Sequence, residues 1–221
     1  YIITINSTDG SIIDKKNVQF DKHEILKVKL KGNYLYAIYE RTSTSNTTQM
    51  PFNILKYDLY GDSIKWKCFP LFPGNEADAF SIDIDSNDNV YCTGAYSYGK
   101  WGFAKISSNG EILYQQTIHR HNEENSLVSK GLFVSVINNR PYFVGHLDGY
   151  YSFTNYNTHL VALDEGTGEI LLSKDIVANG ISLNSSVIDI KELSDNKVLV
   201  LYRRGRIPEL VCYNSNSLEV N

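Results

Sequence analysis

The chain has 221 residues, of which 42% are hydrophobic and 21% are charged, and its formal net charge is -4. A chain of this length and composition can bury a sizeable core without disulfide or metal staples. Its basic residues are not concentrated on one segment, so a nucleic-acid partner is not expected. No apolar run approaches the ~18 residues of a membrane span, so membrane insertion is not expected either.

The first half of the chain is built from hairpins. Residues 1–20 hold two short apolar runs around a polar turn at Gly10, a pattern that predicts an antiparallel hairpin. Residues 21–72 begin with apolar residues that alternate with lysines and end with a second hairpin that turns at Gly61. Because alternation with a period of two is typical of half-buried strands, we expect four strands in this segment.

The same pair of hairpins recurs in residues 73–120, 121–178 and 179–221, the last of which ends within its fourth strand. The turns of the second hairpins follow one another at intervals of about 50 residues, apart from the interval of about 58 between Gly110 and Gly168. No helical apolar stripe interrupts the series. A β-sandwich also has evenly spaced strands, but it does not repeat the same two hairpins with the same turns.

The repeat therefore predicts an all-β fold, a β-propeller of four-stranded antiparallel blades with about four and a half blades present. Residues 1–20 are the outer hairpin of a partial blade, and 179–221 are a truncated one. We expect the chain to be part of a larger propeller or assembly. Cys68, Cys92 and Cys212 are far apart and lie within strand-like runs, so buried free thiols are expected.

Two segments carry a family resemblance. NDNVYCTGAY followed by GFAKISSNGEILYQQTI resembles the seven-bladed β-propeller repeat (SBBP-like), and HLVALDEGTGEILLSKDI is similar to the related quinoprotein-type repeat. The resemblance implies a propeller that lies at the cell surface or outside the cell. Quinoprotein dehydrogenases have many blade tryptophans and acidic metal ligands in the channel, whereas this chain has only Trp66 and Trp101.

We therefore expect a non-enzymatic binding or scaffolding protein, without a cofactor, that contacts a protein or a carbohydrate. The alternative is a propeller enzyme of the quinoprotein or lyase type with its active site at the mouth of the channel. A catalytic propeller would gather His, Asp, Glu or Arg there, whereas a scaffold needs only a complementary surface.

Two predicted connections between the second and third strands of neighbouring blades are rich in aromatic residues, and both should lie on one rim of the propeller. Aromatic rings beside polar side chains suit a glycan or an extended protein segment, although packing between blades would also explain them. The candidate contact residues are Tyr96, Tyr98, Trp101, Tyr150, Tyr151 and Tyr156.

A few other residues resemble metal sites. His119 and His121 alternate on one segment, and His146 should reach the same face, which makes a zinc site feasible, although solvated histidines are the simpler interpretation. The stretch from Asp83 to Asp88 resembles the start of a calcium loop, but Gly94 stands where the bidentate Glu belongs. We expect an ordinary hairpin turn there.

Overall fold

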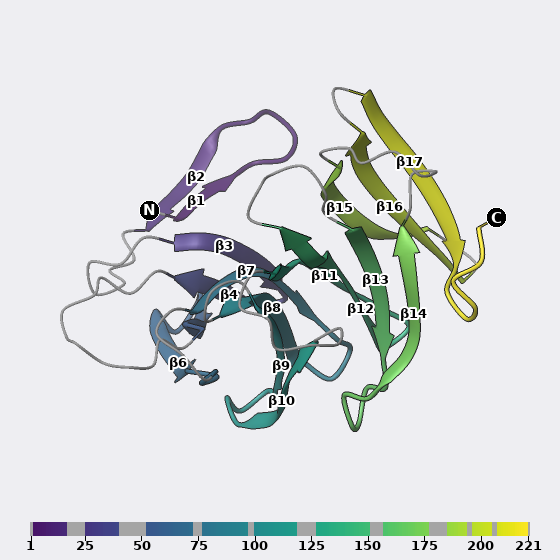
Figure 1. Ribbon diagram of the computed structural model, residues 1–221. Helices are drawn as coiled ribbons and strands as arrows, with labels where there is room; N and C mark the ends of the chain where they lie inside the picture. Colours follow the sequence, from purple (N-terminus) through teal and green to yellow (C-terminus); the bar gives the residue numbers. More distant parts are fainter. Residues whose placement is uncertain are drawn as a thin grey trace.

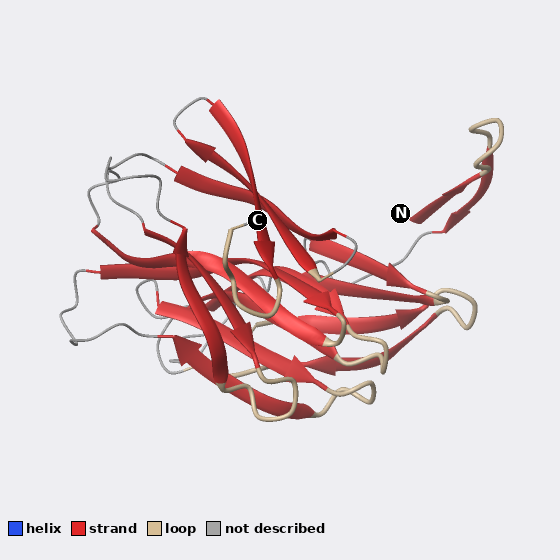
Figure 2. Ribbon diagram, turned by 90° about the vertical axis from the view of Figure 1, so that its right-hand side faces the viewer, coloured by secondary structure: helices blue, strands red, loops and turns tan. Residues whose placement is uncertain are grey.

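The computed structural model describes residues 2–16, 25–39, 52–72, 77–96, 100–118, 127–150, 157–176, 185–193, 196–204 and 207–220. Over these ranges the chain forms strands and turns, with no helix (Figure 2). The described residues accordingly contain no helix that is long and apolar enough to cross a membrane. The predicted all-β class is confirmed.

The strands form sheets in which each strand pairs antiparallel with the next one along the chain. The first sheet contains β1 (Ile2–Ile5) and β2 (Ile12–Lys16). Three four-stranded sheets follow, made of β3 (Ile25–Lys31), β4 (Tyr34–Tyr39), β5 (Ile54–Asp58) and β6 (Ser63–Cys68); of β7 (Ala77–Ile84), β8 (Val90–Tyr96), β9 (Lys100–Ile106) and β10 (Ile112–Ile118); and of β11 (Leu127–Ile137), β12 (Arg140–Tyr150), β13 (Asn157–Leu163) and β14 (Ile170–Ile176). The last sheet contains β15 (Ser185–Leu193), β16 (Lys197–Arg204) and β17 (Ile207–Asn214).

Figure 1 shows the larger sheets side by side in an arc, with the β1–β2 hairpin at its start. From the second sheet onward, the first strand of each sheet contacts the first strand of the next, since β7 packs against β3 and β11, and β11 packs against β15. The first strands therefore line the inside of the arc. These four-stranded antiparallel sheets confirm the predicted β-propeller, in which each sheet is one blade.

Apolar side chains fill the space between consecutive sheets. Tyr36 and Ile54 of one sheet share a buried cluster with Cys92 of the next. Across the following interface, the ring centroids of Phe103 and Phe143 lie 5.3 Å apart. A third cluster joins β11–β14 to β15–β17. Both faces of an inner sheet are covered, so consecutive residues of β8 and β9 are buried although they point to opposite faces. These two strands therefore do not show the alternation of apolar and polar residues that β3 shows.

The turn that follows each of β1, β5, β9, β13 and β17 is closed by one polar side chain. Its oxygen accepts a hydrogen bond from the backbone N–H two residues further along the chain, which holds the loop in a tight Asx-type or Ser-type turn. These residues are Asn6, Asp58, Ser107, Asp164 and Asn214. Because the ionised carboxylate is the form that accepts such bonds best, the N–H donors lower the pKa of Asp58 and of Asp164.

Two of these turns also receive an aromatic ring from the preceding sheet. Trp66 of β6 lies over Gly110, and its Nε1 donates a hydrogen bond to the Ser108 carbonyl oxygen at 2.9 Å. Tyr114 of β10 lies over Gly168 in the same way. Both glycines have a positive φ, 91° for Gly110 and 75° for Gly168. A side chain at either position would meet the ring, so the packing requires glycine.

The cysteines give a prediction about thiol reactivity. Cys68 and Cys92 are buried, as expected, but Cys212 of β17 is only partly buried. Burial raises the pKa of Cys68 to about 11 and that of Cys92 further. Because the thiolate is the reactive form, Ellman's reagent at about pH 8 should modify Cys212 rapidly and leave the other two largely unmodified.

The control for this experiment is the chain unfolded in guanidinium chloride, in which all three thiols should react at similar rates. A Cys212→Ser variant should lose the rapid phase and keep the slow one. Rapid modification of Cys92 in the folded chain would contradict the packing described above, because burial is the main cause that raises the pKa of that thiol.

Candidate functional site

Trp101 was predicted to lie on the aromatic rim, and that prediction is wrong. Its side chain is completely buried in β9, and its Nε1 donates a hydrogen bond to Thr93 Oγ1 at 2.7 Å. Thr93 Oγ1 in turn donates to the Gly102 carbonyl oxygen at 3.0 Å. The ring faces the following sheet, in one cluster with Phe103 and Phe143. It is a packing residue because β9 begins at Lys100, earlier than the sequence indicated.

The prediction is also wrong for Tyr96, the last residue of β8, which is 4% exposed. Its ring stacks on Phe72 with centroids 5.2 Å apart, and burial raises the pKa of its hydroxyl. Tyr150 ends β12, but its side chain lies outside the described structure. The remaining candidates, Tyr98, Tyr151 and Tyr156, also lie outside the described residues, so their role as ligand contacts stays a prediction.

The predicted metal candidates do not come together within the described structure. His119 and His121 lie outside the described residues, and His146 of β12 is a buried side chain with 5% exposure. Among the residues that the structure describes, no group of three His, Cys, Asp or Glu side chains could hold a metal ion.

The calcium-like stretch is the hairpin turn between β7 and β8. The Asp85 carboxylate accepts hydrogen bonds from the backbone N–H groups of Asn87 and Asn89, each at 2.9 Å, and from Asn89 Nδ2 at 2.8 Å. Tyr91 also donates its hydroxyl to Asp85, at 3.3 Å. The carboxylate oxygens are thus used to close the turn, which confirms the interpretation as an ordinary turn.

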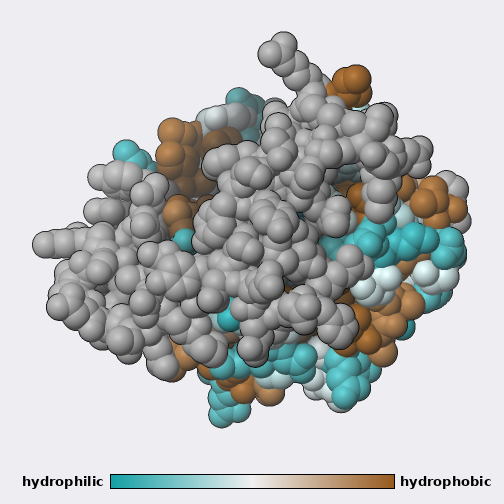
Figure 3. Space-filling view, in the orientation of Figure 1, coloured by the Kyte–Doolittle hydropathy of each residue, from teal (hydrophilic) through white to brown (hydrophobic). Residues whose placement is uncertain are grey.

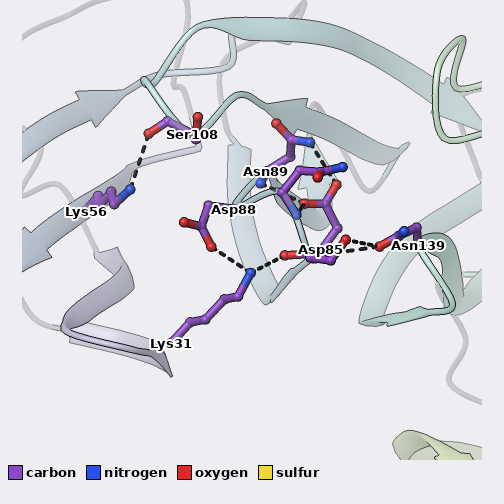
Figure 4. A network of polar contacts seen from close by, with 9 residues as sticks. Lys31, Lys56, Asp85, Asp88, Asn89, Ser108 and Asn139 are labelled. Atoms are coloured by element: carbon purple, nitrogen blue, oxygen red, sulfur yellow. Dashed lines mark hydrogen bonds and ion pairs between the residues drawn. The ribbon is translucent and has the colours of Figure 1, made fainter.

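The same turn ties three sheets together (Figure 4). Lys31, at the end of β3, places its Nζ 2.6 Å from Asp88 Oδ1 and 2.5 Å from the Asp85 carbonyl oxygen. On the other side, Ser86 Oγ donates to Asn139 Oδ1 at 2.7 Å, in the turn between β11 and β12. These donors and acceptors satisfy one another, so we assign the network a structural role.

Two buried lysines also link one sheet to the next sheet along the chain. Lys56 of β5 lies 4.3 Å from the centroid of the Tyr34 ring and places its Nζ 3.4 Å from the Ser108 carbonyl oxygen in the next sheet. Burial lowers the pKa of Lys56, because desolvation disfavours the charged amine. Lys105, at the matching position of β9, donates to the Glu165 carbonyl oxygen at 2.6 Å.

A third polar group was missed by the sequence analysis. It joins neighbouring strands β13 and β14, where His159 pairs with Asp175 in the strand register. His159 Nδ1 lies 2.5 Å from Asp175 Oδ1, and His159 Nε2 lies 2.5 Å from Ser173 Oγ. No sequence motif marks these residues, but the register of a hairpin that turns near Gly166 places all three on one face of the sheet.

The β1–β2 hairpin has an uncovered apolar face. Ile3 and Ile5 of β1 are 47% and 56% exposed. Leu55 and Tyr57, which hold the same positions relative to the turn residue in β5, are 1% and 4% exposed. The difference arises because Leu55 and Tyr57 lie in a buried cluster against which Ile2 of β1 packs, whereas no described sheet covers the face of β1 that carries Ile3 and Ile5.

A second row of exposed apolar side chains lies on β3. Leu26, Val28 and Leu30 are 48%, 48% and 60% exposed, whereas Ile82, which matches Val28 in β7, is 4% exposed. Figure 3 shows hydrophobic side chains gathered over the β1–β2 hairpin, at the upper left of the view. We call the residues Ile3, Ile5, Leu26, Val28 and Leu30 the open apolar surface. Exposed apolar residues that follow one another along one face of a strand, as they do in each of these two rows, mark candidate interaction sites.

Comparison with known proteins identifies the fold and no more. No family model matches the chain, and no curated protein matches it. Among solved structures, it is similar to Kuenenia stuttgartiensis hydrazine synthase, with a TM-score of 0.62 and 9% identity over 96% of this chain and 56% of that one. It is also similar to the WD40 domain of Toxoplasma gondii coronin, with a TM-score of 0.58 and 8% identity over 89% of this chain and 44% of that one.

A third similar structure is the extracellular domain of a hybrid two-component system from B. thetaiotaomicron. Its TM-score is 0.57 and its identity 13%, over 99% of this chain and 24% of that one. The chain thus spans about half or less of each of these three solved chains. These neighbours have propeller-type folds, and together with the four-stranded sheets they define the class: the fold of this chain is a β-propeller.

Proposed function

We propose that this chain is a binding or scaffolding β-propeller that takes up a β-hairpin of a protein partner on the open edge of β1. The observation that carries the proposal is the open apolar surface, in which Ile3, Ile5 and Val28 are exposed while their counterparts Leu55, Tyr57 and Ile82 are buried. Burying such side chains stabilises a complex by roughly 25 cal/mol per Å² of apolar area. A partner that covers this surface would remove it from water.

The repeat indicates that a β-hairpin is the kind of partner segment that would pair with β1. The hairpins that match β1–β2 are β5–β6, β9–β10 and β13–β14, and each has two further strands on its inner edge. A partner hairpin would pair with the edge of β1 that no other described strand occupies, through main-chain hydrogen bonds, which is the usual mode of β-augmentation. Its apolar side chains would then lie over Val28 and Leu30, as an inner hairpin does in the other sheets.

The new contact would extend an interface that already exists. Ile2, on the opposite face of β1, packs against a buried cluster that contains Leu35, Leu55 and Tyr57. Lys16 of β2 adds a hydrogen bond from its Nζ to the Leu59 carbonyl oxygen at 2.6 Å. The hairpin is therefore held in place against β3–β6 before a partner arrives, which lowers the entropic cost of binding.

We also propose that the protein lies at the cell surface or outside the cell. One of the similar solved structures is an extracellular domain, and another is a WD40 domain of coronin. Their identities to this chain are 13% and 8%, so they support the binding role through the shared fold alone.

Photo-crosslinking tests the proposal directly. A benzophenone amino acid at position 30 should crosslink to a protein from the native source several-fold more strongly than the same group at position 113. Leu113 of β10 is a matched control, since its exposure of 51% is close to the 60% of Leu30 and it lies on the outer strand of another sheet.

The crosslinked species should be a protein, and its crosslinked peptide should come from an antiparallel hairpin. Leu26→Ser combined with Val28→Ser should reduce the crosslinking at position 30 while the circular dichroism spectrum stays the same. Equal crosslinking at positions 30 and 113 would contradict the proposal, and so would crosslinking to a helical peptide.

A further inference from the structure

The group formed by Ser173, His159 and Asp175 has the arrangement of an activated serine. Asp175 accepts a hydrogen bond from Nδ1 of the imidazole when the proton lies on that nitrogen. In this tautomer Nε2 carries the lone pair and accepts the hydroxyl proton of Ser173. The carboxylate therefore fixes the ring in the form in which it can act as a general base toward the serine.

The burial of the three side chains differs in the way that such chemistry requires. The His159 side chain is 4% exposed and the Asp175 side chain is 31% exposed, so the base and its orienting group are largely shielded from solvent. Ser173 is an exposed residue. A nucleophile has to be accessible to its substrate, whereas a buried base retains its orientation.

The position of Ser173 in the sheet supplies donors for a developing negative charge. β14 is the outer strand of its sheet and pairs only with β13 among the described strands. In an antiparallel strand, alternate N–H groups point to opposite edges, so the amide of Ser173 or that of Lys174 faces away from β13. An outward N–H beside the nucleophile is the kind of group that stabilises an oxyanion.

We propose that Ser173 is a nucleophile activated by His159 and positioned through Asp175, and that it reacts with small carboxylic esters. The inference goes beyond the binding role and does not depend on it. If it holds, the expectation of a non-enzymatic protein is wrong for this site. A small ester is the fitting substrate class, because the serine lies on an open strand and meets its substrate at the surface.

The reaction balances without any co-reactant besides water. Ser173 Oγ forms a bond to the acyl carbon while its proton passes to His159 Nε2. The imidazolium then gives this proton to the alkoxide oxygen as the ester C–O bond breaks, and the alcohol leaves. Water attacks the acyl group, its proton passes through the same nitrogen to Ser173 Oγ, and the acid is released.

Acylation by p-nitrophenyl acetate tests the proposal. Peptide mass spectrometry should find the acetyl group on Ser173, formed about 100-fold faster than on Ser11, because a positioned general base contributes factors of this size. Ser11 is a matched control, since it is exposed and its hydroxyl donates to Asp9 at 2.7 Å. Ser173→Ala should abolish the fast release of p-nitrophenol, and Ser11→Ala should leave it unchanged.

A second measurement separates an inactive serine from an unfolded variant. In Ser173→Cys, iodoacetamide should alkylate the new thiol about tenfold faster than in Ser11→Cys near neutral pH, because a neighbouring imidazole favours the thiolate. Thermal melting should show both variants folded. Equal acetylation of Ser173 and Ser11, or equal alkylation of the two cysteines in folded protein, would overturn the proposal.

Discussion

Replacing Trp101 with alanine should lower the free energy of unfolding by about 3–5 kcal/mol, the usual cost of removing a large aromatic side chain from a core. The ring has no exposed surface, and its loss would leave a cavity beside Phe103 and Phe143. It would also leave Thr93 Oγ1 without the hydrogen bond that Trp101 Nε1 donates. Equilibrium denaturation in guanidinium chloride, followed by circular dichroism, measures the change.

Tyr60→Ala is the control for this experiment. Tyr60 is 81% exposed, so the loss of its ring should change the stability by no more than about 0.5 kcal/mol. A Trp101→Ala variant that kept its full stability but lost binding to a ligand would restore the original interpretation of Trp101 as a rim residue. A variant that unfolds would establish the ring as part of the core.

Gly110→Ala should destabilise the chain by about 2–4 kcal/mol, from two causes that can be separated. The positive φ of 91° costs about 1 kcal/mol for any residue with a side chain. A Cβ at this position would in addition lie 2.8 Å from Trp66 Cγ, and such overpacking costs about 1–3 kcal/mol. Thermal or chemical unfolding measures the sum.

Gly10→Ala isolates the first of these causes. Gly10 occupies the matching turn of the β1–β2 hairpin with a φ of 74°, but a Cβ there would meet no atom within 4 Å. The expected loss is therefore about 1 kcal/mol. If both variants lost the same stability, the contact between the Trp66 ring and the turn would contribute nothing, contrary to the packing seen in the structure.

The fold could be predicted from the sequence because the repeat is carried by local signals. Polar residues such as Asp58, Ser107 and Asp164 close the turns at regular intervals, and strands with alternating residues flank them. These signals act over a few residues, so no long-range information is needed to recognise a sheet. Their repetition then fixes the class of fold.

The aromatic rim could not be predicted in the same way, because the ends of strands are the least certain part of a pattern. The sequence placed Tyr96 and Trp101 in a connection, whereas the structure includes both in strands, β8 and β9. A shift of a few residues at a strand end decides whether a ring lies in a loop or between two sheets. Both rings are consequently buried.

The group around His159 was missed for a different reason. Its three residues are separated by 14 and 16 positions and form no motif, so catalytic signatures do not include them. The signal lies in the register of the hairpin, in which Val161 pairs with Ser173 and His159 with Asp175. The register shifts by one residue between Ala162 and Leu163, so simple outward pairing from the turn would set His159 opposite Lys174, and the sequence alone does not bring the three side chains together.

Several side-chain links between sheets point the same way along the chain. Trp66 and Lys56 reach from one sheet to the turn at Ser108 in the next, and Lys105 reaches to Glu165 in the sheet after that. In these links, a turn of each sheet accepts hydrogen bonds from the sheet before it, and its own side chains donate to the sheet after it. Duplication or loss of a whole sheet preserves these contacts, because the donor side chains and the accepting turn of a sheet lie together in its third and fourth strands. The arc can therefore gain or lose complete blades in evolution, because each blade carries both the donor side chains and the accepting turn.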